Sequence, residues 1–364
     1  MQPEKKEIKN KKRKKILTVV LSSVASVLLI ITICLLTFLV FIPKAKLNKI
    51  EKLVEENELV TLSSIKNSIC FGSYPQTKIK DNTLFSTLTS MASTDLNNWI
   101  DYGYYINGKV EGYMYYKDIE LDGSKYRGVY FNQYRPYNTC YTNYSSSGDI
   151  SYKDSRQYNN DYRTKILYWF KYEPIKWNIL KIEDNKVLII SDLLLDSQDY
   201  NYTDQERYGA VDYQGNKTNN TIHANNYMYS HIRSWLNLTF YETAFNELEK
   251  EIIDTTTVDN SAKTTAKRRN IYARGSTNDK MFLLSYKEVK KYFSSDEERQ
   301  AQGSEYAKCQ GLEISFNNDM YYWLRSPNYS EDYFAGYVGS LTFNNYQRVY
   351  YTNIGVRPSC WINL

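Results

Sequence analysis

The sequence predicts an α+β fold: a single N-terminal transmembrane helix, then one mainly antiparallel-sheet ectodomain with peripheral helices. Three observations favour this class. An uncharged apolar run covers residues 16–42. Beyond it, pairs of strand-like segments joined by tight turns are mixed with short amphipathic helical segments. The order of these segments shows neither βαβ alternation nor an internal repeat, which is typical of antiparallel α+β domains.

The apolar run is long enough to span a membrane. At about 1.5 Å per residue it reaches roughly 40 Å, more than the ~30 Å of a hydrocarbon core. Lysine and arginine dominate residues 5–15, which places the N-terminus in the cytoplasm and the C-terminal domain outside the cell. The alternative, a cleaved signal peptide, normally has an apolar core of about 7–15 residues. We therefore expect a single-pass protein of the cell membrane, whose segments are a basic cytoplasmic arm (1–15), a transmembrane helix in contact with the lipid bilayer (16–42), a stalk helix (43–62) and an extracellular domain (63–364).

Composition excludes some partners and leaves others open. The net charge of +5 comes largely from the basic arm, so charge gives no case for nucleic-acid binding. The chain contains 37 tyrosines, and asparagine is also abundant. An AT-rich genome explains both residue types, and so does a surface that uses Tyr and Asn for binding.

Cysteine and histidine are scarce. Of the five cysteines, Cys34 lies in the apolar run, and Cys70, Cys140, Cys309 and Cys360 allow three disulfide pairings. A location outside the cell permits disulfides. No C-x-x-C motif occurs and the chain has only two histidines, so we expect no Cys/His zinc site. The loop carboxylates show no twelve-residue calcium pattern, so we expect no other metal, and no cofactor is predicted.

The elements of the ectodomain are expected in the following order. Strands are predicted at 69–75, 114–121, 125–131, 174–182, 187–191, 281–284, 321–324, 335–341, 348–351 and 356–362. Helices are predicted at 83–100, 227–238, 241–253 and 285–293, and polar loops at 135–163 and 197–222. Asp122-Gly123 is a strong hairpin turn, and residues 183–186 form the turn of a second hairpin. Ser285 with Glu288 forms a capping-box pattern.

The usual catalytic motifs do not occur. The chain lacks a G-x-S-x-G elbow, a phosphate loop and H-E-x-x-H. His231 falls in the amphipathic segment 227–238, and we interpret it as a packed or surface histidine. Carboxylates are plentiful, so a hydrolase with an Asp/Glu pair stays open as an alternative.

Five motifs carry a family resemblance. They are FGSYPQ (71–76), KYRGVYF (125–131), EPIKW (173–177), WLRSP (323–327) and GVRP (355–358). In these motifs the sequence resembles an uncharacterised ectodomain family of low-GC Gram-positive bacteria. The last two also resemble the ends of C-type-lectin-like domains, the group that includes formylglycine-generating enzymes. This resemblance implies a lectin-like fold for about 165–364 and a structural role for the motif residues Trp177, Trp235, Trp323, Arg325, Gly355 and Arg357.

The sequence departs from the active members of that group. The oxidising enzymes need two neighbouring cysteines late in the fold, whereas Cys309 and Cys360 lie far apart. The calcium-dependent lectins need an amide after the Glu-Pro pair, where this chain has Ile175. Neither activity is therefore expected.

The stretch between the two end motifs predicts a ligand-facing surface. Tyrosine offers stacking faces and asparagine offers amide hydrogen bonds, although codon bias alone would also enrich both. The candidate ligand-binding residues are Asn328, Tyr329, Tyr333, Asn345, Tyr346, Arg348 and Tyr350. We expect a cell-surface module that binds a glycan or a protein ligand, without catalysis. An enzyme acting on surface polymers and a structural or assembly protein are the alternatives.

Overall fold

The computed structural model describes residues 61–62, 68–93, 95–102, 104–106, 109–111, 114–138, 155–266, 269–315, 318, 320–339 and 345–364. The chain divides into two units, Met1–Asn57 and Glu58–Leu364. The first unit, with the predicted cytoplasmic arm and membrane helix, lies outside the described residues. The predicted stalk helix is wrong at its end, because β1 (Thr61–Leu62) is a strand that pairs with β2 (Ser68–Lys78).

The predicted fold class needs a correction. In the part of the chain that the structure describes, no helix is long and apolar enough to cross a membrane. The longest continuous helical segment there runs from α5 (His231–Trp235) through the π-helical turn η6 (Leu236–Phe240) to α6 (Tyr241–Ala244). It spans only about 20 Å, short of the ~30 Å that a bilayer core requires. What the structure supports is an α+β domain with antiparallel sheets.

The main sheet has nine strands, and all of its pairs are antiparallel. Its order is β13-β20-β9-β8-β7-β6-β3, and β2 also pairs with β8. The strand bounds are β3 Ile100–Asp101, β6 Met114–Leu121, β7 Ser124–Phe131, β8 Leu167–Glu183, β9 Lys186–Ser191, β13 Ile253–Asp254 and β20 Ser359–Asn363. The 17-residue β8 pairs with β7 and β2 along its first part and with β9 along its second.

Both predicted hairpins are confirmed. Asp122 and Gly123 join β6 to β7 with φ values of 49° and 72°, the left-handed pair that a tight two-residue turn requires. Asp184 and Asn185 join β8 to β9. β9 is almost wholly buried, as its continuous apolar run predicts.

A second sheet has five strands in the order β10-β19-β16-β17-β18. Its strands are β10 Asp196–Ser197, β16 Tyr322–Pro327, β17 Phe334–Val338, β18 Asn345–Arg348 and β19 Gly355–Val356. β16 and β19 pair in parallel and the other pairs are antiparallel. Three two-stranded ladders complete the strands: β4 Tyr104–Ile106 with β5 Lys109–Glu111, β11 Arg207–Tyr208 with β12 Thr221–Ile222, and β14 Thr256–Asp259 with β15 Ser276–Asp279.

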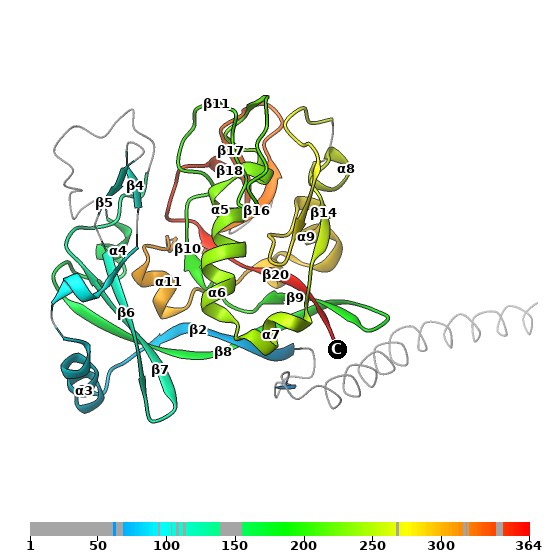
Figure 1. The fold of residues 1–364 in the computed structure, drawn as a ribbon. Helices are drawn as coiled ribbons and strands as arrows, with labels where there is room; N and C mark the ends of the chain where they lie inside the picture. Colours follow the sequence, from blue (N-terminus) through cyan, green and yellow to red (C-terminus); the bar gives the residue numbers. More distant parts are fainter. Residues whose placement is uncertain are drawn as a thin grey trace, which may run out of the picture. The chain divides into compact units, whose positions relative to one another are not determined.

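The helices of the described residues are short. Besides α5, η6 and α6, they are α3 Asn82–Ala92, η2 Leu96–Asn98, α4 Arg156–Asn159, η5 Tyr227–Tyr229, α7 Glu247–Ile252, α8 Ala262–Thr265, α9 Tyr286–Tyr292, α10 Asp296–Arg299 and α11 Glu305–Cys309. Figure 1 shows α6 and α11 beside β2, between the main sheet and the second sheet. The predicted capping box is confirmed, because Ser285 and Glu288 exchange hydrogen bonds at the start of α9. The predicted strand 281–284 is wrong: Phe282 forms only an isolated bridge with Ser359.

The core of the domain lies where these elements meet. Buried side chains from β9, α9, α11 and β16 form one cluster, among them Ile190, Val289 and Leu324. Another cluster packs α3 against β7 and β8 around Leu88 and Trp169. Burying an aliphatic or aromatic side chain of this kind contributes about 1.5–3 kcal/mol to folding.

Candidate functional site

A polar cavity of about 270 Å³ opens where β2, β6 and β7 meet the segment 196–199 and α5. Its inner wall consists of buried side chains, namely Tyr74, Arg127, Asp196, Gln198, Asp199 and Trp235. Asp101 and Thr239 line its exposed side. The cavity therefore combines charged groups and aromatic rings that are mostly shielded from solvent.

An ion pair between Asp199 and His231 forms one side of the cavity. The Oδ2 atom of Asp199 lies 3.0 Å from Nδ1 of His231, the first residue of α5. Burial alone would raise the pKa of Asp199, but the charge and hydrogen bond of His231 outweigh it, so the pKa is lowered from its usual value. Burial would lower the pKa of His231, but Asp199 raises it above its usual value. Each partner therefore favours the charged form of the other.

Asp196 occupies a different environment only three residues earlier. The hydroxyl of Tyr74 donates a 2.7 Å hydrogen bond to its Oδ2 atom, and the amide of Ser197 and Nε2 of Gln198 donate to Oδ1. Complete burial raises the pKa of Asp196 despite these bonds and the nearby charge of Arg135. The cavity thus holds two carboxyl groups whose pKa values are displaced in opposite directions.

Arg127 contributes a fixed cation from β7. Its Nε and Nη2 atoms bind the two oxygens of Asp118 at 2.7 and 2.8 Å, a bidentate arrangement that fixes the guanidinium plane. The guanidinium lies 4.2 Å from the centre of the Tyr116 ring, and the Tyr116 and Tyr102 rings lie 4.9 Å apart. Aromatic and cationic surfaces are therefore held together on this wall.

Hydrogen bonds from Arg135 and Trp323 fix the segment 196–199. Arg135 is 3% exposed and donates to the carbonyls of Ser197 and Gln310 and to Oε1 of Gln198. The indole of Trp323 donates a 2.8 Å hydrogen bond to the carbonyl of Gln198. These hydrogen bonds hold the carboxyl groups in one geometry.

The residues predicted to bind ligand lie elsewhere. They occupy the loop after β16, the strand β18 and the turn after it, and none of them lines the cavity. Tyr329 and Tyr346 are brought together, with ring centres 6.3 Å apart, and Arg348 donates to the hydroxyl of Tyr350. Tyr333 packs on Phe334 at 4.9 Å, and Asn345 is partly buried. Asn328 is 8% exposed and accepts hydrogen bonds from the amides of Ser330 and Glu331, so it organises a turn.

The motif residues expected to be structural are buried. Trp177, Trp235 and Trp323 are at most 7% exposed, and Trp235 also lines the cavity. Arg357 donates to the carbonyls of Ser191 and Arg299, which ties β19 to β9 and α10. Gly355 is also buried: a Cβ atom there would lie 2.6 Å from Leu194 and 2.8 Å from the Tyr321 carbonyl. Cys70, Cys309 and Cys360 are free thiols, and Cys140 lies outside the described residues.

The sequence held only faint signals for this cavity. Tyr74 and Arg127 belong to motifs that carried the family resemblance, but nothing in the motifs assigned them a role. His231 is one of only two histidines, and its amphipathic segment predicts a packed or surface residue. Asp196 and Asp199 frame the start of a segment predicted to be a loop. Their convergence depends on contacts between segments more than 100 residues apart, such as Tyr74 with Asp196.

Fold and cavity together define an α+β domain with a charged, aromatic-lined cavity. Residues 184–364 match the model of a family described as a domain of unknown function, DUF6273. The match begins in the turn between β8 and β9 and includes Asp196, Asp199 and His231. No curated protein and no solved structure matches the chain. The lectin-like fold and the bacterial range of the family stay predictions from the sequence.

The ion pair of Asp199 and His231 predicts a pH-dependent stability. A lowered carboxyl pKa adds stability above about pH 3.8 that is lost as pH falls through the folded-state value. A raised imidazole pKa adds stability below about pH 6.5 that is lost as pH rises through the folded-state value. Asp199→Asn should therefore lower the free energy of unfolding most between about pH 4 and 6.5, by about 2 kcal/mol.

Urea unfolding of both proteins across pH 3–9 measures this difference. Glu247→Gln is the matched control, because Glu247 is 88% exposed and pairs with Lys250 at the surface. Its effect should stay within about 0.5 kcal/mol at every pH. A difference for Asp199→Asn that is constant across the range would contradict the ion pair.

Proposed function

We propose that the cavity binds one sugar unit of a glycan, which makes this domain a recognition module. The observation that carries the proposal is the convergence of paired charged groups and aromatic rings in one cavity. Small-molecule sites usually measure about 300–1,000 Å³. At about 270 Å³, this cavity suits a single ring or a ligand of similar size.

The lining matches the chemistry of a sugar. Sugar hydroxyls both donate and accept hydrogen bonds, and the cavity offers carboxylate acceptors, the phenol of Tyr74 and the guanidinium of Arg127. A carboxylate has about four acceptor positions, so pairing with His231 does not exhaust Asp199. The rings of Tyr102, Tyr116 and Trp235 supply faces for the apolar C–H surface of a sugar. Because the charged groups are already fixed by their partners, little side-chain entropy is lost on binding.

A glycan array and a peptide array, probed with the purified full-length protein, test the proposal. A glycan should be retained, and calorimetric titration of that glycan should show one site per chain. Asp199→Asn and Arg127→Gln should each weaken binding at least tenfold, since a hydrogen bond to a charged group contributes about 1.5–3 kcal/mol. Circular dichroism checks that each variant is folded.

The predicted tyrosine surface provides the matched control. Tyr329→Ala and Tyr346→Ala lie outside the cavity lining and should leave the affinity unchanged. If these two variants abolish binding while the cavity variants bind normally, the ligand sits near β18 and the proposal is wrong. Retention of peptides alone would also contradict it.

A second candidate function is hydrolysis of a glycosidic bond. The observation that favours it is the opposite displacement of the Asp196 and Asp199 pKa values. A protonated acid beside an ionised carboxylate is the combination that glycoside hydrolysis requires. Under this alternative, the bound glycan is cleaved by the wild-type protein, and Asp196→Asn stops cleavage while binding persists.

A further inference from the structure

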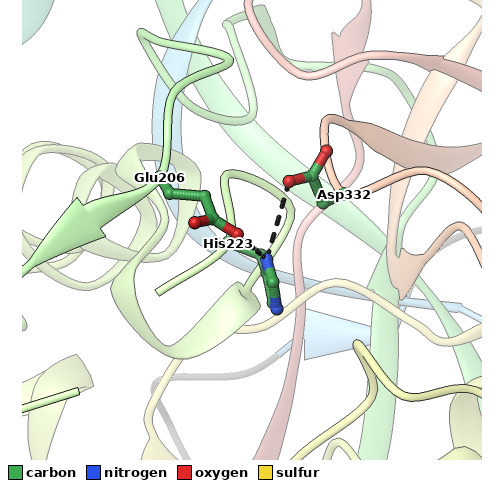
Figure 2. Close-up of side chains that lie close together, drawn as sticks. All are labelled: Glu206, His223 and Asp332. Carbon is green, nitrogen blue, oxygen red and sulfur yellow. Dashed lines mark ion pairs between the residues drawn. The ribbon is translucent and has the colours of Figure 1, made fainter. Parts of the chain in front are cut away.

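A second group of ionisable side chains lies apart from the cavity. It consists of Glu206, His223 and Asp332, and Figure 2 shows both carboxylates directed at the imidazole ring. The Nδ1 atom of His223 lies 2.7 Å from Oε1 of Glu206 and 3.6 Å from Oδ2 of Asp332. One donor atom from each residue falls within 4.8 Å of the other two.

The two-stranded ladder of β11 and β12 brings Glu206 and His223 close together. Arg207 pairs with Ile222 and Tyr208 with Thr221, so the next rung outward sets Glu206 opposite His223. Strand alternation turns Arg207 to the other face. There its Nη2 atom donates to the carbonyl of Tyr229 at 2.8 Å and its guanidinium stacks on Tyr202.

The third residue is held by a buried asparagine. Asn225 is fully buried, and its amide donates to the carbonyl of Asp332 at 2.8 Å. Its side chain donates to the carbonyls of Glu331 and Phe334 at 2.9 and 3.1 Å. Asn328 caps the same loop from its other end. The loop that carries Asp332 is thus clamped to the segment that follows His223.

The imidazole of His223 is oriented by a neighbouring ring, but its Nδ1 atom lacks an aligned hydrogen bond among the described residues. The Tyr272 ring meets it edge-on, with centres 4.9 Å apart and an angle of 89°. The Nδ1 atom is buried, yet among the described residues no group makes an aligned hydrogen bond with it, although Glu206 is close. Burial and the charges of Asp332, Glu331 and Glu206 raise the pKa of Tyr272, which indicates a negative local potential. A buried nitrogen beside two carboxylates, without hydrogen-bond alignment, is a favourable environment for a shared cation.

We propose that Glu206, His223 and Asp332 bind a divalent zinc ion. Donors bound at about 2.1 Å lie about 3.0–3.4 Å apart in octahedral or tetrahedral geometry, and the two distances at Nδ1 bracket that range. One nitrogen and two carboxylates suit zinc, whereas calcium takes six to eight oxygens. The sequence predicts no metal, because histidine is scarce and no known ligand motif occurs. This set uses one histidine and draws its other ligands from loop carboxylates that no motif marks.

Calorimetric titration of chelator-treated, full-length protein with zinc chloride tests the site. One ion per chain should bind, with a dissociation constant in the micromolar range or below, and the melting temperature should rise with zinc. His223→Ala and Asp332→Asn should each weaken zinc binding at least tenfold. Magnesium and calcium chloride at the same concentration should not displace the ion.

The chain supplies matched controls for both ligand types. His231→Gln removes the other histidine, and Asp204→Asn removes a carboxylate two residues from Glu206 that lies outside the cluster. Both variants should bind zinc as the wild type does. The proposal is overturned if wild-type protein takes up no zinc, if His223→Ala binds it normally, or if only the His231 variant loses it. Should His223→Ala misfold by circular dichroism, the isosteric Glu206→Gln and Asp332→Asn decide in its place.

Discussion

Replacing Glu288 with glutamine is expected to lower the free energy of unfolding by about 3 kcal/mol. The reason is Arg325, which is 1% exposed and has its guanidinium bound to both oxygens of Glu288. Its other side-chain hydrogen bonds go to the backbone carbonyls of Leu283 and Asp259, which are uncharged groups. Removing one member of such a pair leaves a buried cation without its counter-charge, which is more costly than the loss of a hydrogen bond.

The substitution Glu288→Gln removes the negative charge but keeps a side chain that can form the helix cap. Glu288 also accepts a 2.8 Å hydrogen bond from the amide of Ser285, and glutamine serves equally well in a capping box. The control is Glu305→Gln, which removes a partly exposed pair with Lys308 and should cost less than about 0.5 kcal/mol. Chemical unfolding at neutral pH measures both. A loss below about 1 kcal/mol for Glu288→Gln would mean that the buried guanidinium does not depend on that carboxylate.

Substituting alanine for Gly72 is expected to have a comparable effect, about 2–4 kcal/mol. Gly72 interrupts the pairing of β2 with β8 at φ = 66°, a left-handed conformation that a Cβ atom disfavours. A Cβ atom there would lie 2.5 Å from the Phe245 ring and 2.9 Å from the carbonyl of Ala244. Because that ring also stacks on Trp177, it has little room to move.

Gly123→Ala separates the two causes. Gly123 has a φ of 72°, but a Cβ atom at this turn would meet nothing within 4 Å. Its substitution should cost only the conformational part, about 1 kcal/mol. Thermal and urea unfolding of both variants give the comparison. Equal losses at the two positions would show that the contact with Phe245 relaxes without cost.

The sequence predicted the elements that depend on local chemistry. Asp122-Gly123 and Asp184-Asn185 set two hairpins, and the Ser285–Glu288 box starts α9, because each signal lies within a few residues of its effect. The five-stranded sheet was not predicted. Its parallel contact joins β16 to β19 across about thirty residues, and β10 enters from far earlier in the chain.

The candidate sites were hidden for the same reason. The pairing of Tyr74 with Asp196, and that of His223 with Asp332, joins segments that no periodicity links. The abundance of tyrosine and asparagine between the end motifs predicts a ligand-binding surface there. In the structure Asn328 accepts hydrogen bonds from the amides of Ser330 and Glu331, because a short loop uses its polar groups to satisfy its own backbone. The hydroxyl of Tyr350 accepts a hydrogen bond from Arg348.

The position of β9 has a practical consequence for anyone who shortens this protein. The family match starts at Asp184, but β9 lies between β20 and β8, and β8 is outside the match. A fragment that starts there would leave the backbone of an almost entirely apolar strand without its neighbour. Such a strand recruits other chains. Aggregation of that fragment would result from the choice of its first residue rather than from an unstable domain. A fragment that starts before β2 keeps β8 beside β9.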